Sequence, residues 1–224
     1  MATLQALYDE IADDVRTASS QSASDIANQI TNRVADAVTF YEGGDEAFWF
    51  LQQVATLPTV VGQELYDLPS DIQIANHRML LADSSITEPL ERRDNRWLDA
   101  RYLDSTQGRP LYWAILQDQL RVRPLPDDVY TLSLTYYKSL GVPSDVNTSN
   151  DWTSTAKELI RARAEWSIYQ FVMKDSGMAA ACKGAEGEAL VNLRRRSMKM
   201  KTTGRLVATS DSPMQRDSWS ITNG

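Results

Sequence analysis

The spacing of apolar residues changes twice along this chain, and this change constrains the fold more than any other feature. Near both ends, apolar residues recur every three or four positions, which predicts amphipathic helices. Between Phe48 and Tyr137, short apolar runs alternate with Pro, Gly and Asp, which predicts strands and turns. We therefore expect an α+β fold: an antiparallel helical bundle, with helices near both ends of the chain, a central inserted β region and an extended C-terminal tail.

The first 42 residues predict two antiparallel helices joined by a short loop. Ser22 to Asp25 supplies N-cap residues for the second helix, and Gly43-Gly44 ends it. Four carboxylates of the first helix lie outside its apolar stripe and are expected on its sides and outer face. The two stripes consist of Leu4, Leu7, Tyr8, Ile11 and Val15 in the first helix, and Ile26, Ile30, Val34, Ala37 and Tyr41 in the second.

The central region contains one clear strand and one clear hairpin. Residues 129–137 alternate in polarity, which predicts a strand with one buried face. Residues 111–116 and 120–123 predict a hairpin around the turn at 117–119. The buried face of the strand is expected to comprise Tyr130, Leu132, Leu134 and Tyr136.

Helical spacing returns at Trp152, where Asp151 can act as the N-cap. A break at 175–177 separates this helix from a second one, which Gly184 and Gly187 weaken. The expected apolar positions are Leu159, Ala162, Trp166, Tyr169 and Met173 in the first helix, and Met178, Cys182, Ala185, Ala189 and Leu193 in the second.

We expect four parts along the chain. Residues 1–46 form an N-terminal helical pair, residues 47–145 a β-rich region, residues 146–201 a C-terminal helical pair that completes the bundle, and residues 202–224 an extended tail. The tail is dominated by Thr, Ser, Asp, Gly and Pro without periodicity, so we expect it to lack a core of its own.

The two ends of the chain carry opposite charge. Residues 1–193 hold 16 Lys and Arg against 28 Asp and Glu, a net charge of −12, while residues 194–224 hold 7 against 2, a net charge of +5. The basic residues of this second segment are open to three interpretations: a solvated helix end, a docking segment for an acidic protein surface, or a phosphate contact with nucleic acid. Aromatic residues are sparse there, which disfavours a platform for stacking bases.

No motif in the sequence carries recognisable chemistry. His77 is the single histidine, which excludes an HExxH site and any site with several histidines. Cys182 falls on an apolar stripe, which indicates a buried thiol rather than a nucleophile. Neither a phosphate-binding loop, a GxGxxG motif nor a GxSxG elbow occurs. We expect a protein that is not an enzyme, with no catalytic residue, cofactor or metal.

The cellular context is expected to be cytoplasmic. One cysteine cannot form an internal disulfide, and the first residues have neither the basic flank nor the apolar run of a secretion signal. Nowhere does an apolar stretch approach the roughly 18 residues of a membrane span, so no membrane association is expected.

The order of these segments resembles that of the head-to-tail adaptor proteins of short-tailed bacteriophages, over roughly residues 3–200. The likeness is carried by Phe48-Trp49, Thr59, Gly62, Tyr66-Asp67-Leu68-Pro69, Gly108-Arg109-Pro110, Tyr112, Pro124-Leu125-Pro126, Tyr130 to Tyr137 and Trp152 to Asp175. The turn at 117–119 departs from the family, because a glycine is expected there.

The resemblance implies a ring subunit of the virion, assembled in the bacterial cytoplasm and expected to form a dodecamer between the portal protein and a tail tube or nozzle protein. DNA would pass through the ring without specific binding, which favours an acidic channel wall. An extended segment of 24 residues could reach roughly 80 Å along the portal. The expected portal-docking residues are Arg194, Arg195, Arg196, Lys199, Lys201, Arg205 and Trp219, and the expected channel-lining residues are Asp9, Glu10, Asp13 and Asp14.

Two other interpretations stay open from the residues alone. A nucleic-acid-binding regulator could use the basic C-terminal segment, and would bind DNA with an affinity that falls steeply with salt. Against it stand the acidic body and the lack of a helix-turn-helix pattern. An enzyme with an unrecognised polar cleft is the third interpretation.

Overall fold

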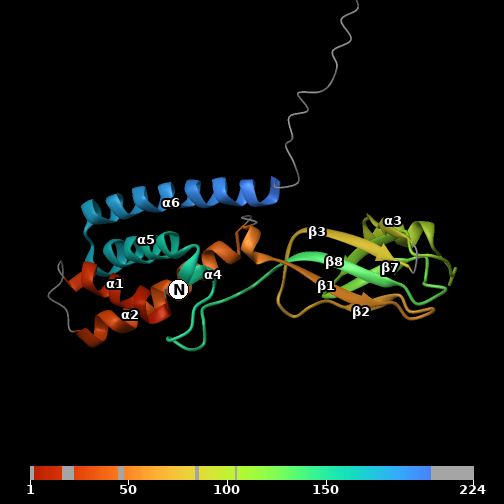
Figure 1. The fold of residues 1–224 in the computed structure, drawn as a ribbon, viewed down its shortest axis with the longest axis horizontal. Coiled ribbons are helices and arrows are strands. Elements are labelled where there is room, and N and C mark those ends of the chain that lie inside the picture. Colours follow the sequence, from red (N-terminus) through yellow and green to blue (C-terminus); the bar gives the residue numbers. More distant parts are fainter. Residues whose placement is uncertain (1–2, 17–22, 45–47, 84–85, 104, 203–224) are drawn as a thin grey trace, which may run out of the picture.

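A computed structural model describes residues 3–16, 23–44, 48–83, 86–103 and 105–202. All labelled helices except the short α3 gather at one end of an elongated molecule, and α3 lies with the strands at the other (Figure 1). This arrangement confirms the expected α+β fold, in which N-terminal and C-terminal helices pack together and the β region is inserted between them in the sequence. Along the described residues, no helix is long and apolar enough to cross a membrane.

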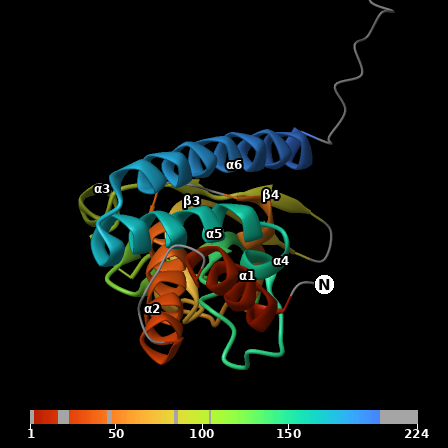
Figure 2. The same cartoon turned by 90° about the vertical axis from the view of Figure 1, so that its left-hand side faces the viewer.

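The helical body combines segments from both ends of the chain. Its long helices are α1 (Leu4–Arg16), α2 (Ala23–Glu42), α5 (Lys157–Ser167) and α6 (Ser176–Thr202). Shorter pieces are η1 (Trp49–Leu51), α4 (Asp151–Ser154) and the π-helix η2 (Ile168–Met173), which continues α5. In the end-on view, α5 lies beneath α6, with α1 and α2 below it (Figure 2). The body therefore has α5 at its centre.

The N-terminal stripes are confirmed. Nine of the ten expected residues of α1 and α2 are buried in one cluster with residues of α5 and α6, and the tenth, Tyr8, packs partly buried against it. Burying such side chains stabilises the body by about 25 cal/mol for each Å² of apolar surface. Of the expected N-cap residues of α2, Ser22 lies outside the described residues, and the structure does not describe the side chains of residues 23–25.

Two expectations about the C-terminal helices were wrong. Asn150, not Asp151, caps α4, since its side-chain oxygen accepts hydrogen bonds from the backbone N–H groups of Trp152 and Thr153. In α6, Met178 and Ala185 are exposed, and Glu186 occupies the buried stripe that Ala185 was expected to fill. An acidic residue can occupy this buried stripe because Glu186 has hydrogen-bond partners inside the helical body.

Two four-stranded sheets make up the β region. The first has the order β1–β8–β3–β4, comprising β1 (Gln52–Pro58), β8 (Thr131–Lys138), β3 (Ile72–Ala82) and β4 (Thr87–Pro89). The second has the order β2–β7–β6–β5, comprising β2 (Leu65–Asp67), β7 (Gln119–Arg123), β6 (Tyr112–Leu116) and β5 (Glu91–Arg92), and α3 (Asn95–Arg101) connects β5 to β6. Buried side chains of both sheets share one apolar cluster, as in a β-sandwich.

The expected hairpin and strand are present. In the hairpin β6–β7, Leu116 pairs with Gln119, so the turn has two residues and Gln119 belongs to the strand rather than to the turn. Gln117 adopts φ 56°, the conformation that favours glycine, at the place where the family resemblance led us to expect one. On β8, Leu132, Leu134 and Tyr136 are buried as expected.

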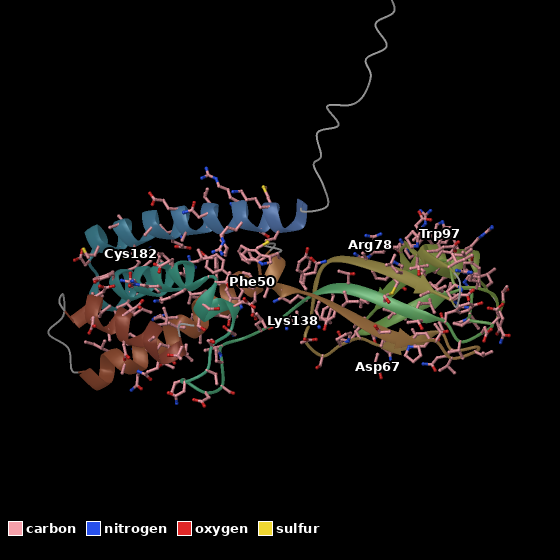
Figure 3. All side chains as sticks on the ribbon, viewed as in Figure 1. Phe50, Asp67, Arg78, Trp97, Lys138 and Cys182 are labelled. Atoms are coloured by element: carbon pink, nitrogen blue, oxygen red, sulfur yellow. The ribbon has the colours of Figure 1, made fainter. Side chains whose placement is uncertain are left out.

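A buried carboxylate connects the helical body to the sheets. Glu42, the last residue of α2, accepts hydrogen bonds from the hydroxyl of Ser139, the backbone N–H groups of Leu140 and Gly141, and the indole N–H of Trp152, at 2.5 to 2.9 Å. Phe50 and Lys138 mark this junction in Figure 3. The contacts fix the point where the chain returns from β8 to the body.

Candidate assembly surfaces

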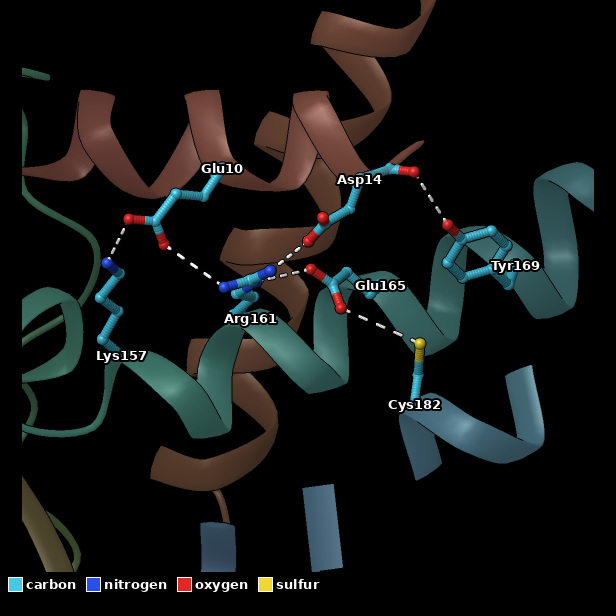
Figure 4. A network of polar contacts seen from close by, with 7 residues as sticks. All are labelled: Glu10, Asp14, Lys157, Arg161, Glu165, Tyr169 and Cys182. Carbon is cyan, nitrogen blue, oxygen red and sulfur yellow. Dashed lines mark hydrogen bonds and ion pairs between the residues drawn. The ribbon is translucent and has the colours of Figure 1, made fainter. Parts of the chain in front are cut away.

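The acidic side of α1 is divided between internal ion pairs and solvent. The Glu10 carboxylate accepts a hydrogen bond from the Lys157 ammonium group at 2.5 Å, and Asp14 forms an ion pair with Arg161. Both ion pairs join α1 to α5 (Figure 4). Asp9 and Asp13 are exposed. Of the four carboxylates expected to line a channel, two therefore help to hold α1 on α5, and two face outward. The channel-lining role stays a prediction.

The network continues from Arg161 into the interior. Its guanidinium Nε donates to Glu165 at 2.8 Å, the Cys182 thiol lies 3.9 Å from the other oxygen of Glu165, and the Tyr169 hydroxyl donates to the carbonyl of Asp14 at 3.2 Å (Figure 4). One arginine thus connects α1 and α5, and the carboxylate that it holds reaches α6. These contacts join helices from the two ends of the chain.

Burial controls ionisation in this network. It raises the pKa of Glu165 to about 7, because the ion pair with Arg161 only partly offsets the loss of solvent. Burial and the nearby Glu165 carboxylate raise the pKa of the Cys182 thiol to about 11. A thiol with so high a pKa stays protonated at neutral pH, so Cys182 is a packing residue rather than a nucleophile.

The basic end of α6 lies over the start of the β region. Arg194, Arg195, Arg196 and Lys199 are exposed. The Arg196 guanidinium lies 5.6 Å from the Trp49 ring, and Ser197 accepts a hydrogen bond from the backbone N–H of Trp49, so α6 is attached to η1 at this point. The side chain of Lys201, and Arg205 and Trp219 altogether, lie outside the described residues.

A buried acid on α6 is the residue that the sequence pattern missed. The Glu186 carboxylate accepts from the Tyr41 hydroxyl at 2.6 Å and pairs with Lys183 at 2.8 Å and Arg163 at 3.3 Å. Burial opposes its ionisation, but the hydrogen bonds and cations outweigh burial and lower its pKa. The expected stripe placed Ala185 there instead, and two of the partners that make burial of this acid possible, Tyr41 and Arg163, lie on other helices.

Taken together, the fold and these surfaces are those of a structural subunit, whose described charged side chains hold helices together or face outward. Among the described residues, no group of three or more acidic, histidine or cysteine side chains could hold a metal ion.

The chain belongs to the SU10 adaptor protein family, whose sequence model matches residues 2–212. It is therefore a bacteriophage head-to-tail adaptor, a structural protein of the virion that joins portal to tail and is not an enzyme. The family resemblance and the expected lack of enzymatic activity are confirmed. None of the curated proteins matches the chain.

Proposed function

We propose that this adaptor forms a closed ring, expected to contain twelve copies, between the portal and a tail tube or nozzle protein. DNA passes through the ring without specific binding. The family match over nearly the whole chain carries the proposal. A ring needs a contact that repeats from copy to copy in one direction, so each copy must present two different complementary faces.

Portal docking is assigned to the basic end of α6 and the residues that follow it. The segment from residue 194 onward holds seven basic and two acidic residues, whereas the preceding chain is strongly acidic. Cations on an exposed helix end attract an acidic protein surface, and the segment beyond residue 202 is long enough to extend along a neighbouring ring.

Truncation tests the docking role. A chain ending at Thr202 keeps every described helix and strand, so we expect the same circular dichroism spectrum and unfolding midpoint as for the full chain. Co-sedimentation with purified portal rings should be lost. A variant with Arg195→Gln and Lys199→Gln should retain part of the binding, and this residual binding should weaken further with salt. Full binding by the truncated chain would overturn the docking role of the segment beyond residue 202, and full binding by the Arg195→Gln, Lys199→Gln variant would overturn that of the basic end of α6.

The channel role is limited to the exposed acids. Asp9 and Asp13 remain available to face passing DNA, where like charge would keep the duplex from adhering. Asp9→Asn with Asp13→Asn should leave folding intact and raise the affinity of assembled rings for duplex DNA. The same variant measured on the unassembled chain controls for binding outside the channel, and unchanged affinity of the rings would contradict this role.

A further inference from the structure

One flank of the helical body carries a patch of aromatic rings and cations, in which Trp166 and Arg163 are half-buried between exposed neighbours. Phe40 on α2 is 53% exposed and Phe171 on η2 is 58% exposed. The Arg163 guanidinium lies 3.9 Å from the centroid of Phe40 and 4.5 Å from that of Trp166, and Trp166 meets Phe171 edge-on at 5.6 Å. With Lys183, which lies 4.9 Å from the Trp166 ring, these residues form what we term the aromatic–cation face.

The composition of this face is that of a protein interface. Exposed apolar surface of this kind is costly in a monomer unless it is covered in an assembly. Tryptophan and arginine are the residues most often found to dominate the free energy of binding. The rings are already stacked on the cations, so little side-chain freedom is lost when a partner covers them.

The face has a surplus of positive charge. Arg163 and Lys183 share a single carboxylate, Glu186, which is only 4% exposed and also accepts the Tyr41 hydroxyl. One carboxylate therefore neutralises only one of the two cations. A complementary partner should offer an apolar depression beside a carboxylate.

The opposite flank of the same helices offers both features. Between α5 and α6 lies a depression of about 140 Å³ that is lined mainly by apolar surface, and we term it the α5–α6 pocket. The exposed carboxylate of Glu158 stands at its edge. The pocket is lined by Thr155, Ala156, Glu158, Leu159, Ala189, Asn192, Leu193 and Arg196.

Helical phase separates the two features mainly around α6. Around α5, Glu158 and Arg163 point about 140° apart at 3.6 residues per turn, whereas Leu159 of the pocket and Trp166 of the face point about 20° apart. Lys183 and Asn192 are nine residues apart and point about 180° apart around α6. A copy can therefore use the aromatic–cation face on one flank and the α5–α6 pocket on the other at the same time.

We propose that these two features form the contact between successive copies of the ring: the aromatic–cation face of one copy covers the α5–α6 pocket of the next. Because the faces differ and lie on opposite flanks, the contact repeats in one direction and can close. Glu158 meets the surplus cation, and the pocket receives the exposed aromatic surface. This inference rests on the proposed ring.

Cross-linking between copies tests the contact directly. The variant Asp36→Cys with Asn192→Cys carries one thiol on each flank, since exposed Asp36 borders Phe40 and Phe171, and native Cys182 is buried. Assembled on purified portal rings and treated with a short bismaleimide, it should give a ladder of linked oligomers in a denaturing gel. Either single variant should give no ladder, since it carries a new thiol on only one flank.

A substitution on the face provides a second readout. Phe171→Asp should raise the concentration needed for half-maximal ring assembly about tenfold or more, as expected for a residue central to an interface. Leu103→Asp is the matched control: Leu103 is 88% exposed but lies in the β region, so assembly should be unchanged. Circular dichroism of the unassembled variants separates loss of contact from loss of folding.

The outcomes distinguish the contact from the ring itself. Wild-type rings seen by negative-stain microscopy, together with no ladder from the double-cysteine variant, would overturn the proposed contact and leave the ring intact. No rings from the wild-type chain, alone or on portal, would overturn the ring and the contact with it. A ladder from the double variant alone, together with impaired assembly of Phe171→Asp, supports both.

Discussion

At the junction between the helical body and the sheets, the Glu42 carboxylate accepts four hydrogen bonds from groups on the returning chain. Glu42→Gln keeps the size of the side chain and an oxygen for the three N–H donors, but it removes the charge and presents an amide NH₂ to the Ser139 hydroxyl. We expect a loss of about 1–2 kcal/mol in the free energy of unfolding, measured by urea titration, because hydrogen bonds to a charged acceptor are stronger than those to a neutral one. Glu91→Gln is the matched control: Glu91 forms an exposed ion pair with Arg93, so this change should alter the free energy of unfolding by less than about 0.5 kcal/mol.

Glu165 gives the helical body a dependence on pH. Its pKa rises from 4.5 to about 7 in the folded protein, so between these values the folded chain binds more protons than the unfolded chain. Stability therefore falls as pH rises through this range. Glu165→Gln removes the titrating group but keeps an acceptor for Arg161. From pH 5 to pH 8, the wild type should lose about 2 kcal/mol relative to the variant in urea titrations. An equal difference at both pH values would contradict this.

At the scale of elements, the periodicity of the sequence predicted most of the fold, because amphipathic helices and alternating strands follow directly from what each face must bury. The helices α1 and α2 and the strand β8 fall where their stripes place them. Pairing between distant segments leaves no such local signal. Neither the division of the strands into two sheets nor the partners of Glu186 could be read from spacing, because their contacts join residues far apart in the chain.

The candidate site was less predictable than the fold. Charge density alone identified the basic end of α6 and the acids of α1, but it could not tell that Glu10 and Asp14 pair with α5. The sequence did not predict the aromatic–cation face, because Trp166 was assigned to the apolar stripe that packs into the core. Phe40 lies off the apolar stripe of α2, and this position was the signal that could have revealed it.

Two glycines weaken α6 without a packing reason. A Cβ atom on Gly184 or Gly187 would have no neighbour within 4 Å, so Ala fits at either position. Each change should stabilise the protein by about 0.5–1 kcal/mol through helix propensity, measured by thermal or urea unfolding. Gly62→Ala is the opposite case. Gly62 has φ +76°, and a Cβ atom there would lie 3.2 Å from the Gln107 side chain, so this change should destabilise the protein. Destabilisation by both helical changes would contradict the argument.

For the whole molecule, the distribution of apolar residues indicates two cores in one chain. The helical core draws on segments from both ends, and of the described residues in 47–145 it buries only Phe48, Leu51 and Tyr137, while a separate cluster lies between the sheets. The four-part division of the chain remains a prediction, but this separation gives it a physical basis: the helical body should not need the sheets in order to fold.

Excision of the sheets tests that independence. Gln52 and Tyr137 are register partners on β1 and β8, so their Cα atoms lie about 5 Å apart and a Gly-Gly link can replace residues 53–136. The shortened chain keeps Leu51, Tyr137 and all contacts of Glu42. We expect a helical circular dichroism spectrum and a single cooperative thermal transition. A non-cooperative melt, with the full chain cooperative under the same conditions, would show that the helical body depends on the sheets.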